Sequence, residues 1–353
     1  MRSSTKTFLS FLFVSVLGFN KSEAQQFDNP GAYLDYIGKA DDNMTAVYLS
    51  YLSAVGHNKS VRKVEKRRQE VLTSISDTRF KIQGMQPWKG DRSYRDSTVS
   101  YVKLLYNVFN EDYSKIVDME EIAEQSYDAM EAYMMAQEKA QEKLQQAAER
   151  HQVLQKEFAA KYNVTLIEEE TKLSLKSQQA ADLMDHYSAV YLVFFKPYKQ
   201  EGYLMEAINK KNVIAIEENK NSMQKFAEEG LEKLKTLKGY NNDPSLMIAC
   251  RGALQFYKME AGKTQSATDF FMKEENFNKM KKSFDTKPAS KRSKQDIDQY
   301  NNAVKDMNAA VNDYNSTTKQ INKERETMIA NWNDTVRKYL DDYMPVQRKA
   351  SSL

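Results

Sequence analysis

Histidine is the side chain that most often binds metal ions or transfers protons near neutral pH, and this chain has only three, His57, His151 and His186. Di-iron helical bundles need Glu-x-x-His pairs on facing helices, and many zinc proteases need an H-E-x-x-H segment. An alanine or a leucine stands three residues before each histidine, so both patterns are missing. The sequence therefore predicts no metal and no cofactor, and a partly buried, hydrogen-bonded His151. Haem ligation stays an alternative, because His and Tyr can both bind haem iron.

Motifs for nucleophilic or phosphate chemistry are missing as well. The chain has no G-x-S-x-G segment, no P-loop and no G-x-G-x-x-G segment. Its single cysteine, Cys250, lies in the apolar segment MIACRGAL, which predicts a buried and unreactive thiol. We therefore expect no catalytic residues. An enzyme would need acids that converge only in the folded chain, and a pocket with two or more buried acids of raised pKa would be its sign.

Aromatic side chains crowd the middle of the chain and form a candidate ligand pocket. At helical spacing such a stripe usually belongs to the core, but between paired helices it can also line a cavity. The candidate pocket residues are Tyr187, Tyr191, Phe194, Phe195 and Tyr198.

A basic stretch near a predicted loop is the second candidate site. Lysine and arginine side chains gathered around two phenylalanines can contact an anionic partner, although a solvated helix face is the simpler interpretation. The candidate contacts are Lys279, Lys281, Lys282, Lys287, Lys291 and Arg292.

Ser97 is a candidate modification site. The tripeptide Asp96-Ser97-Thr98 is similar to the short Asp-Ser/Thr O-glycosylation motif of Bacteroidota envelope proteins. Because residues 84–96 hold two glycines and a proline, we expect the serine to lie in or beside a loop that could carry a glycan.

The elements that must position these residues are helices. Only 11 Gly and 6 Pro occur in 353 residues, far fewer turn formers than a β-rich fold needs. Apolar and small residues recur in steps of three and four over about 118–162 and 293–344, the period of packed helices. Shorter helices are expected over about 42–56 and 60–83, with breaks at 84–96, 197–202, 239–245 and 285–292. The sequence predicts an elongated all-α fold with long, coiled-coil-like helices.

Two parts of the chain are similar to each other in sequence. Thr45–Tyr51 is similar to Ser188–Phe194, and each segment precedes a charged helix, a Gly/Pro loop and an aromatic-rich helix. A long helix with a Glu-Arg pair closes each half, at Arg150 and Arg325. We therefore predict two related helical-bundle repeats, residues 41–164 and 165–345, after a linker at 25–40 and before a tail at 346–353.

The first 24 residues have the pattern of an export signal. Arg2 and Lys6 precede the apolar run FLSFLFVSVLGF, which is too short to span a bilayer, and small residues precede the expected cleavage after Ala24. No cysteine lies near this position, so we expect no lipoprotein anchor. These features predict a periplasmic or surface-exposed protein of a Gram-negative bacterium without a transmembrane segment.

This layout resembles an uncharacterised family of secreted, surface-exposed all-helical proteins of Bacteroidota and leptospires. The resemblance implies a location and no chemistry. Together the observations favour a non-enzymatic exported envelope or surface protein that acts as a helical binding or structural module for a protein or glycan. The alternative is a helical-bundle carrier of a small ligand such as haem, a lipid or an aromatic compound. The nearly equal numbers of basic and acidic residues, 52 and 49, argue against nucleic acid as a partner.

Overall fold

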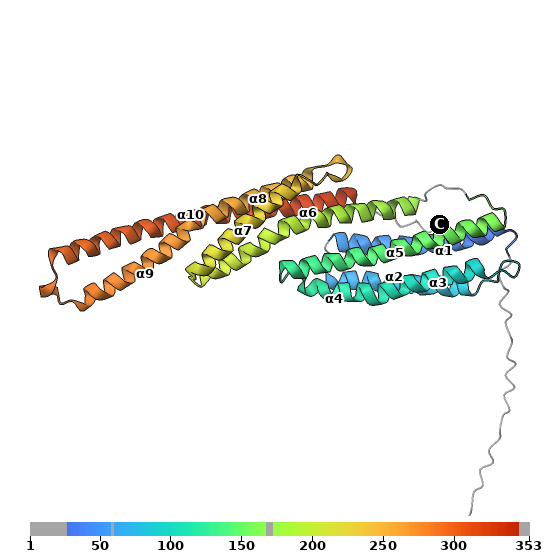
Figure 1. The fold of residues 1–353 in the computed structure, drawn as a ribbon, viewed down its shortest axis with the longest axis horizontal. Coiled ribbons are helices and arrows are strands. Elements are labelled where there is room, and N and C mark those ends of the chain that lie inside the picture. Colours follow the sequence, from blue (N-terminus) through green and yellow to red (C-terminus); the bar gives the residue numbers. More distant parts are fainter. Residues whose placement is uncertain (1–26, 58–59, 167–171, 346–353) are drawn as a thin grey trace, which may run out of the picture.

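The computed structural model describes residues 27–57, 60–166 and 172–345. These residues form ten α-helices joined by short connections, and no β-strand occurs among them. The helices make an elongated, all-α molecule in which α1–α5 lie side by side at one end and α7–α10 extend away at the other (Figure 1). The all-α prediction is confirmed.

The first unit consists of the five helices that precede residue 167. A π-helical segment, Val108–Asp112, joins its third and fourth helices almost without a break. Helix α2 packs between α1 and α3, and α5 lies along both α3 and α4. The helices are α1 (Pro30–Gly56), α2 (Val61–Gln83), α3 (Ser93–Asn107), α4 (Tyr113–Ala123) and α5 (Tyr127–Lys161).

The second unit also consists of five helices, the last of which is the longest in the described chain. Helix α7 packs between α6 and α8, and α10 lies along both α8 and α9. Its first helix, α6, also contacts α1 and α5 and so connects the two units. The helices are α6 (Lys172–Asn209), α7 (Val213–Leu234), α8 (Ser245–Lys263), α9 (Gln265–Thr286) and α10 (Lys294–Tyr343).

In both units a tyrosine at the end of the last helix donates a hydrogen bond to an aspartate that precedes the third helix. Asp91 precedes α3 and accepts hydrogen bonds from the Ser93 amide (2.8 Å) and from the hydroxyl of Tyr162 (2.8 Å), just after α5. Asp243 precedes α8 and accepts bonds from the Ser245 amide (2.8 Å) and from the hydroxyl of Tyr343 (3.0 Å), at the end of α10. The prediction that the two units are related repeats stays a prediction.

The first helix starts earlier than the sequence analysis expected. Residues 25–40 were expected as a linker, but α1 begins at Pro30 after the cap Asn29, whose side chain accepts the Ala32 amide at 2.8 Å. Tyr33 and Ile37, one turn apart, are both buried against the first unit. Their spacing places them on one helix face, so this segment is structural and is not a linker.

One expected break is absent, and one break occurs where a continuous helix was expected. Pro197 was expected to end a helix, yet it lies buried inside the continuous α6. A proline can remain within a helix when packing on both sides outweighs one lost backbone hydrogen bond. Conversely, the helix expected over 118–162 is divided after Ala123, and Ser126 caps the new helix by accepting the Ala129 amide at 3.1 Å. By contrast, the final helix matches its expected bounds, with a capping box made by Ser293 and Asp296.

Candidate functional site

The candidate functional site is a cavity where the two units meet. It has a volume of about 510 Å³ and lies between α6, α10 and the end of α1. All five aromatic residues proposed from the sequence line it from α6, and Trp332 and Leu340 line it from α10. A cavity of this size can hold a small molecule or part of a larger one.

The five aromatic residues contribute unequally to the wall of the cavity. Phe194 and Phe195 are buried, and the ring of Phe194 stacks on Trp332 with 4.1 Å between the ring centroids. Tyr187 and Tyr191 are partly buried, and burial raises the pKa of both phenols well above its ordinary value. Tyr198 has 42% of its surface exposed. The two phenylalanines therefore support the wall, while the tyrosines present aromatic surface and hydroxyl groups to a ligand.

Polar side chains from both units complete the cavity. His57, at the end of α1, faces Asp341 of α10 with 3.0 Å between Nε2 and Oδ1, and its Nδ1 lies 2.7 Å from the Ser53 carbonyl oxygen. Asn333 and Arg337 line the cavity from α10. The side chains of Asp341 and Arg337 are largely exposed, so this polar part of the wall faces solvent.

Gly56 lies at the cavity in close contact with two methionine side chains of the second unit. A Cβ atom at this position would lie 2.5 Å from Cε of Met344 and 3.1 Å from Sδ of Met184. A larger residue at this position would require the ends of these two flexible side chains to move.

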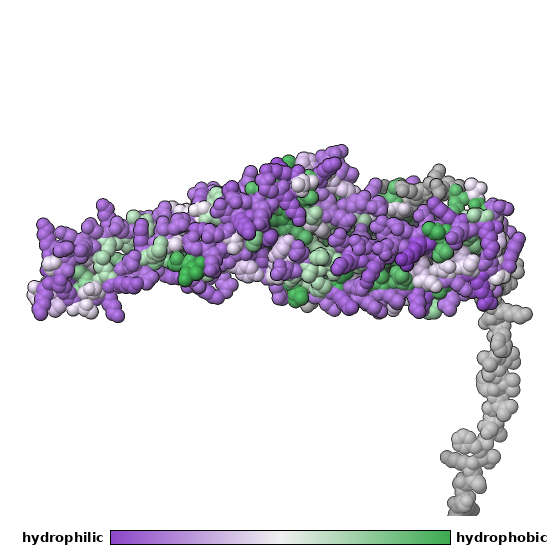
Figure 2. Space-filling model, viewed as in Figure 1, coloured by the Kyte–Doolittle hydropathy of each residue, from purple (hydrophilic) through white to green (hydrophobic). Residues whose placement is uncertain are grey.

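The basic residues proposed from the sequence lie elsewhere, at the free end of the α9–α10 pair. Lys287 pairs with Asp296, and the guanidinium of Arg292 lies 4.2 Å from the ring centroid of Phe284. Lys279 is 2.5 Å from Glu275 on the same helix. Lys281, Lys282 and Lys291 are exposed. The surface of the molecule around this end is largely hydrophilic (Figure 2). The structure therefore separates these candidate contacts from the cavity.

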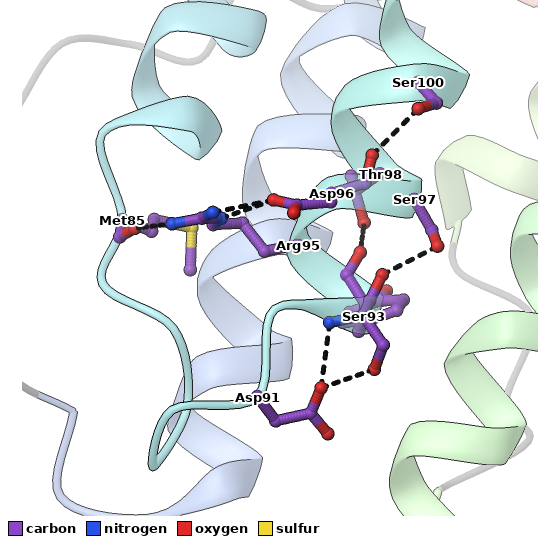
Figure 3. A network of polar contacts seen from close by, with 9 residues as sticks. Met85, Asp91, Ser93, Arg95, Asp96, Ser97, Thr98 and Ser100 are labelled. Carbon is purple, nitrogen blue, oxygen red and sulfur yellow. Dashed lines mark hydrogen bonds and ion pairs between the residues drawn. The ribbon is translucent and has the colours of Figure 1, made fainter.

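Ser97 lies on a helix and not in a loop. Helix α3 begins at Ser93, and the hydroxyl of Ser97 donates to the Ser93 carbonyl oxygen at 2.7 Å, one turn earlier (Figure 3). The expected loop is shorter than predicted because Asp91 accepts hydrogen bonds from both the amide and the hydroxyl of Ser93 and starts the helix there. Glycosylation of this partly buried serine stays a prediction.

His151 occupies a partly buried position in the first unit, as its place on the apolar stripe predicted. Its ring stacks on Tyr101 with 4.5 Å between centroids, and its Nε2 lies 2.9 Å from the hydroxyl of Thr98. Because that hydroxyl already donates to the Tyr94 carbonyl oxygen, Nε2 must be the protonated nitrogen. Burial lowers the pKa of His151 to about 4, so the ring is neutral at pH 7.

A buried charge cluster in the second unit could not be found from sequence spacing. Arg325 of α10 pairs with Glu201 of α6 and with Glu260 of α8. Oε2 of Glu260 has no donor facing it. Burial, followed by the nearby charge of Glu201, raises the pKa of Glu260 to about 8, and a proton on this oxygen can then bond to Glu201. None of the three residues lines the cavity, and the cluster joins α6, α8 and α10.

Comparisons with known proteins give no further indication of function. No protein-family model matches the chain, and neither the curated proteins nor the solved structures contain a significant match. Within the described residues, no group of three or more His, Cys, Asp or Glu side chains is placed to hold a metal ion. No described helix is long and apolar enough to cross a membrane.

Proposed function

We propose that this chain is a non-enzymatic, exported binding module that holds a sugar ring of an envelope glycan in the cavity between its two units. The observation that carries the proposal is the composition of the cavity wall, in which tyrosine and tryptophan rings adjoin exposed amide, carboxylate and guanidinium groups. A sugar ring has apolar C–H faces and a rim of hydroxyl groups, so it needs both kinds of contact. The polar groups of Asn333, Arg337 and Asp341 are exposed on this wall, so sugar hydroxyl groups can exchange hydrogen bonds with them, whereas a purely apolar ligand cannot.

The two tryptophans of the chain provide a direct binding test. Trp332 lines the cavity, whereas Trp88 lies in the first unit beside Tyr33 and Tyr162. In a Trp88→Phe variant, the fluorescence of Trp332 should change on titration with oligosaccharides prepared from bacterial envelopes. The corresponding Trp332→Phe variant should show no change.

A matched pair of tyrosines on α6 tests the position of the ligand. Tyr198 and Tyr203 are exposed to nearly the same extent, 42% and 41%, but only Tyr198 lines the cavity. We expect Tyr198→Ala to weaken glycan binding about tenfold, and Tyr203→Ala to leave it unchanged. Equal effects of both substitutions, or no response of Trp332 to any glycan, would contradict the proposal.

The alternative function is a carrier of a small aromatic compound, and the stacked rings at the cavity favour it. Native mass spectrometry of protein purified from its own host separates the two functions. A carrier should retain a bound compound, whereas a glycan-binding module should be recovered without one and bind sugars when they are added.

Export is a separate part of the proposal. The expected signal sequence, residues 1–24, lies outside the described residues. Sequencing the N-terminus of the mature protein should give Gln25 as its first residue, and the protein should be recovered from the periplasmic or surface fraction. An intact Met1 in the cytoplasmic fraction would reject export without affecting the binding test.

A further inference from the structure

The free end of the α9–α10 pair concentrates the positive charge of the molecule. We call residues 279–298 the arm tip; they comprise the last two turns of α9, the connection that contains Pro288, and the first turn of α10. Seven lysine or arginine residues and three aspartates occur there, an excess of four positive charges, whereas the whole chain has an excess of three. The rest of the molecule therefore has no positive excess, and an anionic partner is attracted to the arm tip.

Only part of this charge is neutralised within the molecule. Lys279 forms an ion pair with Glu275, and Lys287 forms one with Asp296. Four other lysines of the arm tip are exposed and have no carboxylate within ion-pair distance in the described part of the chain: Lys281, Lys282, Lys291 and Lys294. Their ammonium groups, with three donors each, are available to an external anion.

Aromatic packing gives the arm tip a defined shape. Phe284 of α9 stacks on Tyr300 of α10 with 4.4 Å between the ring centroids, and the guanidinium of Arg292 lies 4.2 Å from the centroid of Phe284. Nε of Arg292 also donates a hydrogen bond to the Lys287 carbonyl oxygen at 2.9 Å. These contacts fix the connection between the two helices, so the exposed lysines are presented without an entropic cost of ordering the chain.

Exposed apolar side chains lie among these lysines. Met280 of α9 has 38% of its surface exposed, and Ile297 of α10 has 43%. Met280 follows Lys279 directly, and Ile297 lies one helical turn after Lys294. At the surface of a bilayer, basic side chains contact lipid phosphates while neighbouring apolar side chains enter the boundary of the acyl chains. A nucleic acid, which is bound chiefly through its phosphates, does not require such apolar neighbours.

The position of the arm tip favours a flat partner as well. Helix α9 and the adjoining part of α10 extend beyond the other helices to one end of the elongated molecule (Figure 1). Ile329, the first residue of α10 in the cavity wall, lies 35 residues after Lys294, which corresponds to about 50 Å of helix. The arm tip can therefore meet a surface end-on while the cavity between the units stays accessible.

We infer that the arm tip binds peripherally to an anionic phospholipid bilayer, with its four unpaired lysines on lipid phosphates and with Met280 and Ile297 at the boundary of the acyl chains. This contact involves one leaflet only and needs no helix that spans the membrane. The inference does not depend on the glycan proposal, because different residues about 50 Å apart form the arm tip and the cavity.

Co-sedimentation of the protein purified from its own host with lipid vesicles tests this inference. We expect binding to vesicles of phosphatidylglycerol and phosphatidylcholine in a ratio of about 1:1, and much weaker binding to phosphatidylcholine alone or at high salt. The variant K281Q/K282Q/K291Q/K294Q should bind at least about 100-fold more weakly, because each lysine near an anionic surface contributes roughly fivefold.

A matched variant separates a local contact from an effect of net charge. K63Q/K66Q/K81Q/K103Q removes four exposed lysines of the first unit, which also have no ion-pair partner in the described part of the chain. This variant should bind anionic vesicles within about twofold of the wild type. Circular dichroism and thermal unfolding should show wild-type helix content and stability for both variants, since all eight side chains are exposed.

Two isoleucines distinguish a bilayer from an anionic polymer. Ile297→Ser should weaken binding to vesicles about three- to tenfold, whereas Ile248→Ser, on α8 with 56% of its surface exposed, should not. The inference is overturned if anionic vesicles do not bind, if the two quadruple variants lose binding equally, or if Ile297→Ser binds vesicles like the wild type. Tighter binding of the arm tip to duplex DNA or to an anionic polysaccharide than to vesicles would also overturn it.

Discussion

The closing helices of the two units each carry a partly buried titratable side chain before a buried aromatic residue, and the two side chains are chemically opposite. His151 of α5 lies seven residues before Phe158, and Arg325 of α10 lies seven residues before Trp332. Both aromatic residues are buried in their units. The histidine is neutral and surrounded by tyrosine rings, while the arginine is charged and paired with two acids.

This difference shows that the neighbouring helices decide what a long closing helix can bury. Helix α3 presents Tyr94, Thr98 and Tyr101, which accept a flat ring and supply one hydrogen bond. Helices α6 and α8 present two glutamates instead, which require a cation. The stability of a ring stacked on tyrosines comes from shape complementarity and dispersion. A buried charge cluster is stable only while every charged group keeps its partner.

The largest expected effect follows from removing the cation of the second unit. Arg325→Met leaves Glu201 and Glu260 buried without a positive partner, so we expect the free energy of unfolding to fall by about 3–5 kcal/mol. Urea unfolding followed by the fluorescence of Trp332 in the Trp88→Phe background measures it. The control Arg337→Met removes an exposed arginine of the same helix and should cost less than about 1 kcal/mol. Equal losses in both variants would contradict a buried cluster.

The two units should respond to pH in opposite directions. Glu260 has an ordinary pKa of 4.5 and a pKa of about 8 in the folded chain, so its contribution to stability is complete below pH 4.5 and is lost as the pH rises toward 8. We expect the difference in unfolding free energy between Glu260→Gln and the wild type to change over this interval. A difference that is constant from pH 5 to pH 8 would show that Glu260 holds no extra proton.

His151 should give a smaller effect with the opposite sign. Its pKa falls from an ordinary 6.5 to about 4, so its stability contribution is present above pH 6.5 and is lost as the pH falls toward 4. His151→Phe keeps the stacked ring and removes one hydrogen bond, with an expected cost of about 1 kcal/mol at pH 7. In the Trp332→Phe background, unfolding followed by the fluorescence of Trp88 should show that the free energy of unfolding of the variant rises relative to that of its parent below pH 6. A relative rise above pH 7 instead would contradict a neutral His151 ring.

The smallest effects on stability should come from the tyrosine hydroxyl groups that form hydrogen bonds at the ends of the closing helices. Tyr162→Phe and Tyr343→Phe each remove one hydrogen bond to an aspartate near the surface. We expect both substitutions to lower the thermal midpoint by similar amounts, below the effect of His151→Phe. Markedly unequal shifts would mean that the shared geometry does not reflect a shared role in the two units.

Helix content could be predicted well from the sequence, and helix ends less well. The three- and four-residue spacing along α10 follows directly from which side chains avoid water, so its bounds could be predicted to within a residue or two. The start of α1 and the continuity of α6 through Pro197 depend on packing by other helices. A local pattern contains no information about that packing, which is why these elements were misplaced.

The candidate site, too, could be predicted only in part from the sequence. The aromatic stripe on α6 was visible as a periodic pattern, but its partner Trp332 lies more than 130 residues away and meets it only in the fold. Asp41 lies within α1, and its raised pKa comes mainly from burial against helices far along the chain, which its neighbours in the sequence do not show.

The sequence by itself determined that this chain is helical, because few turn formers and a regular apolar spacing leave no other way to bury its aromatic residues. Only the tertiary structure decided which polar groups share an interior and which cavities remain open. Those outcomes depend on distances between side chains far apart in the chain, such as Glu201 and Arg325, and the electrostatic energy of a buried charge depends on these distances.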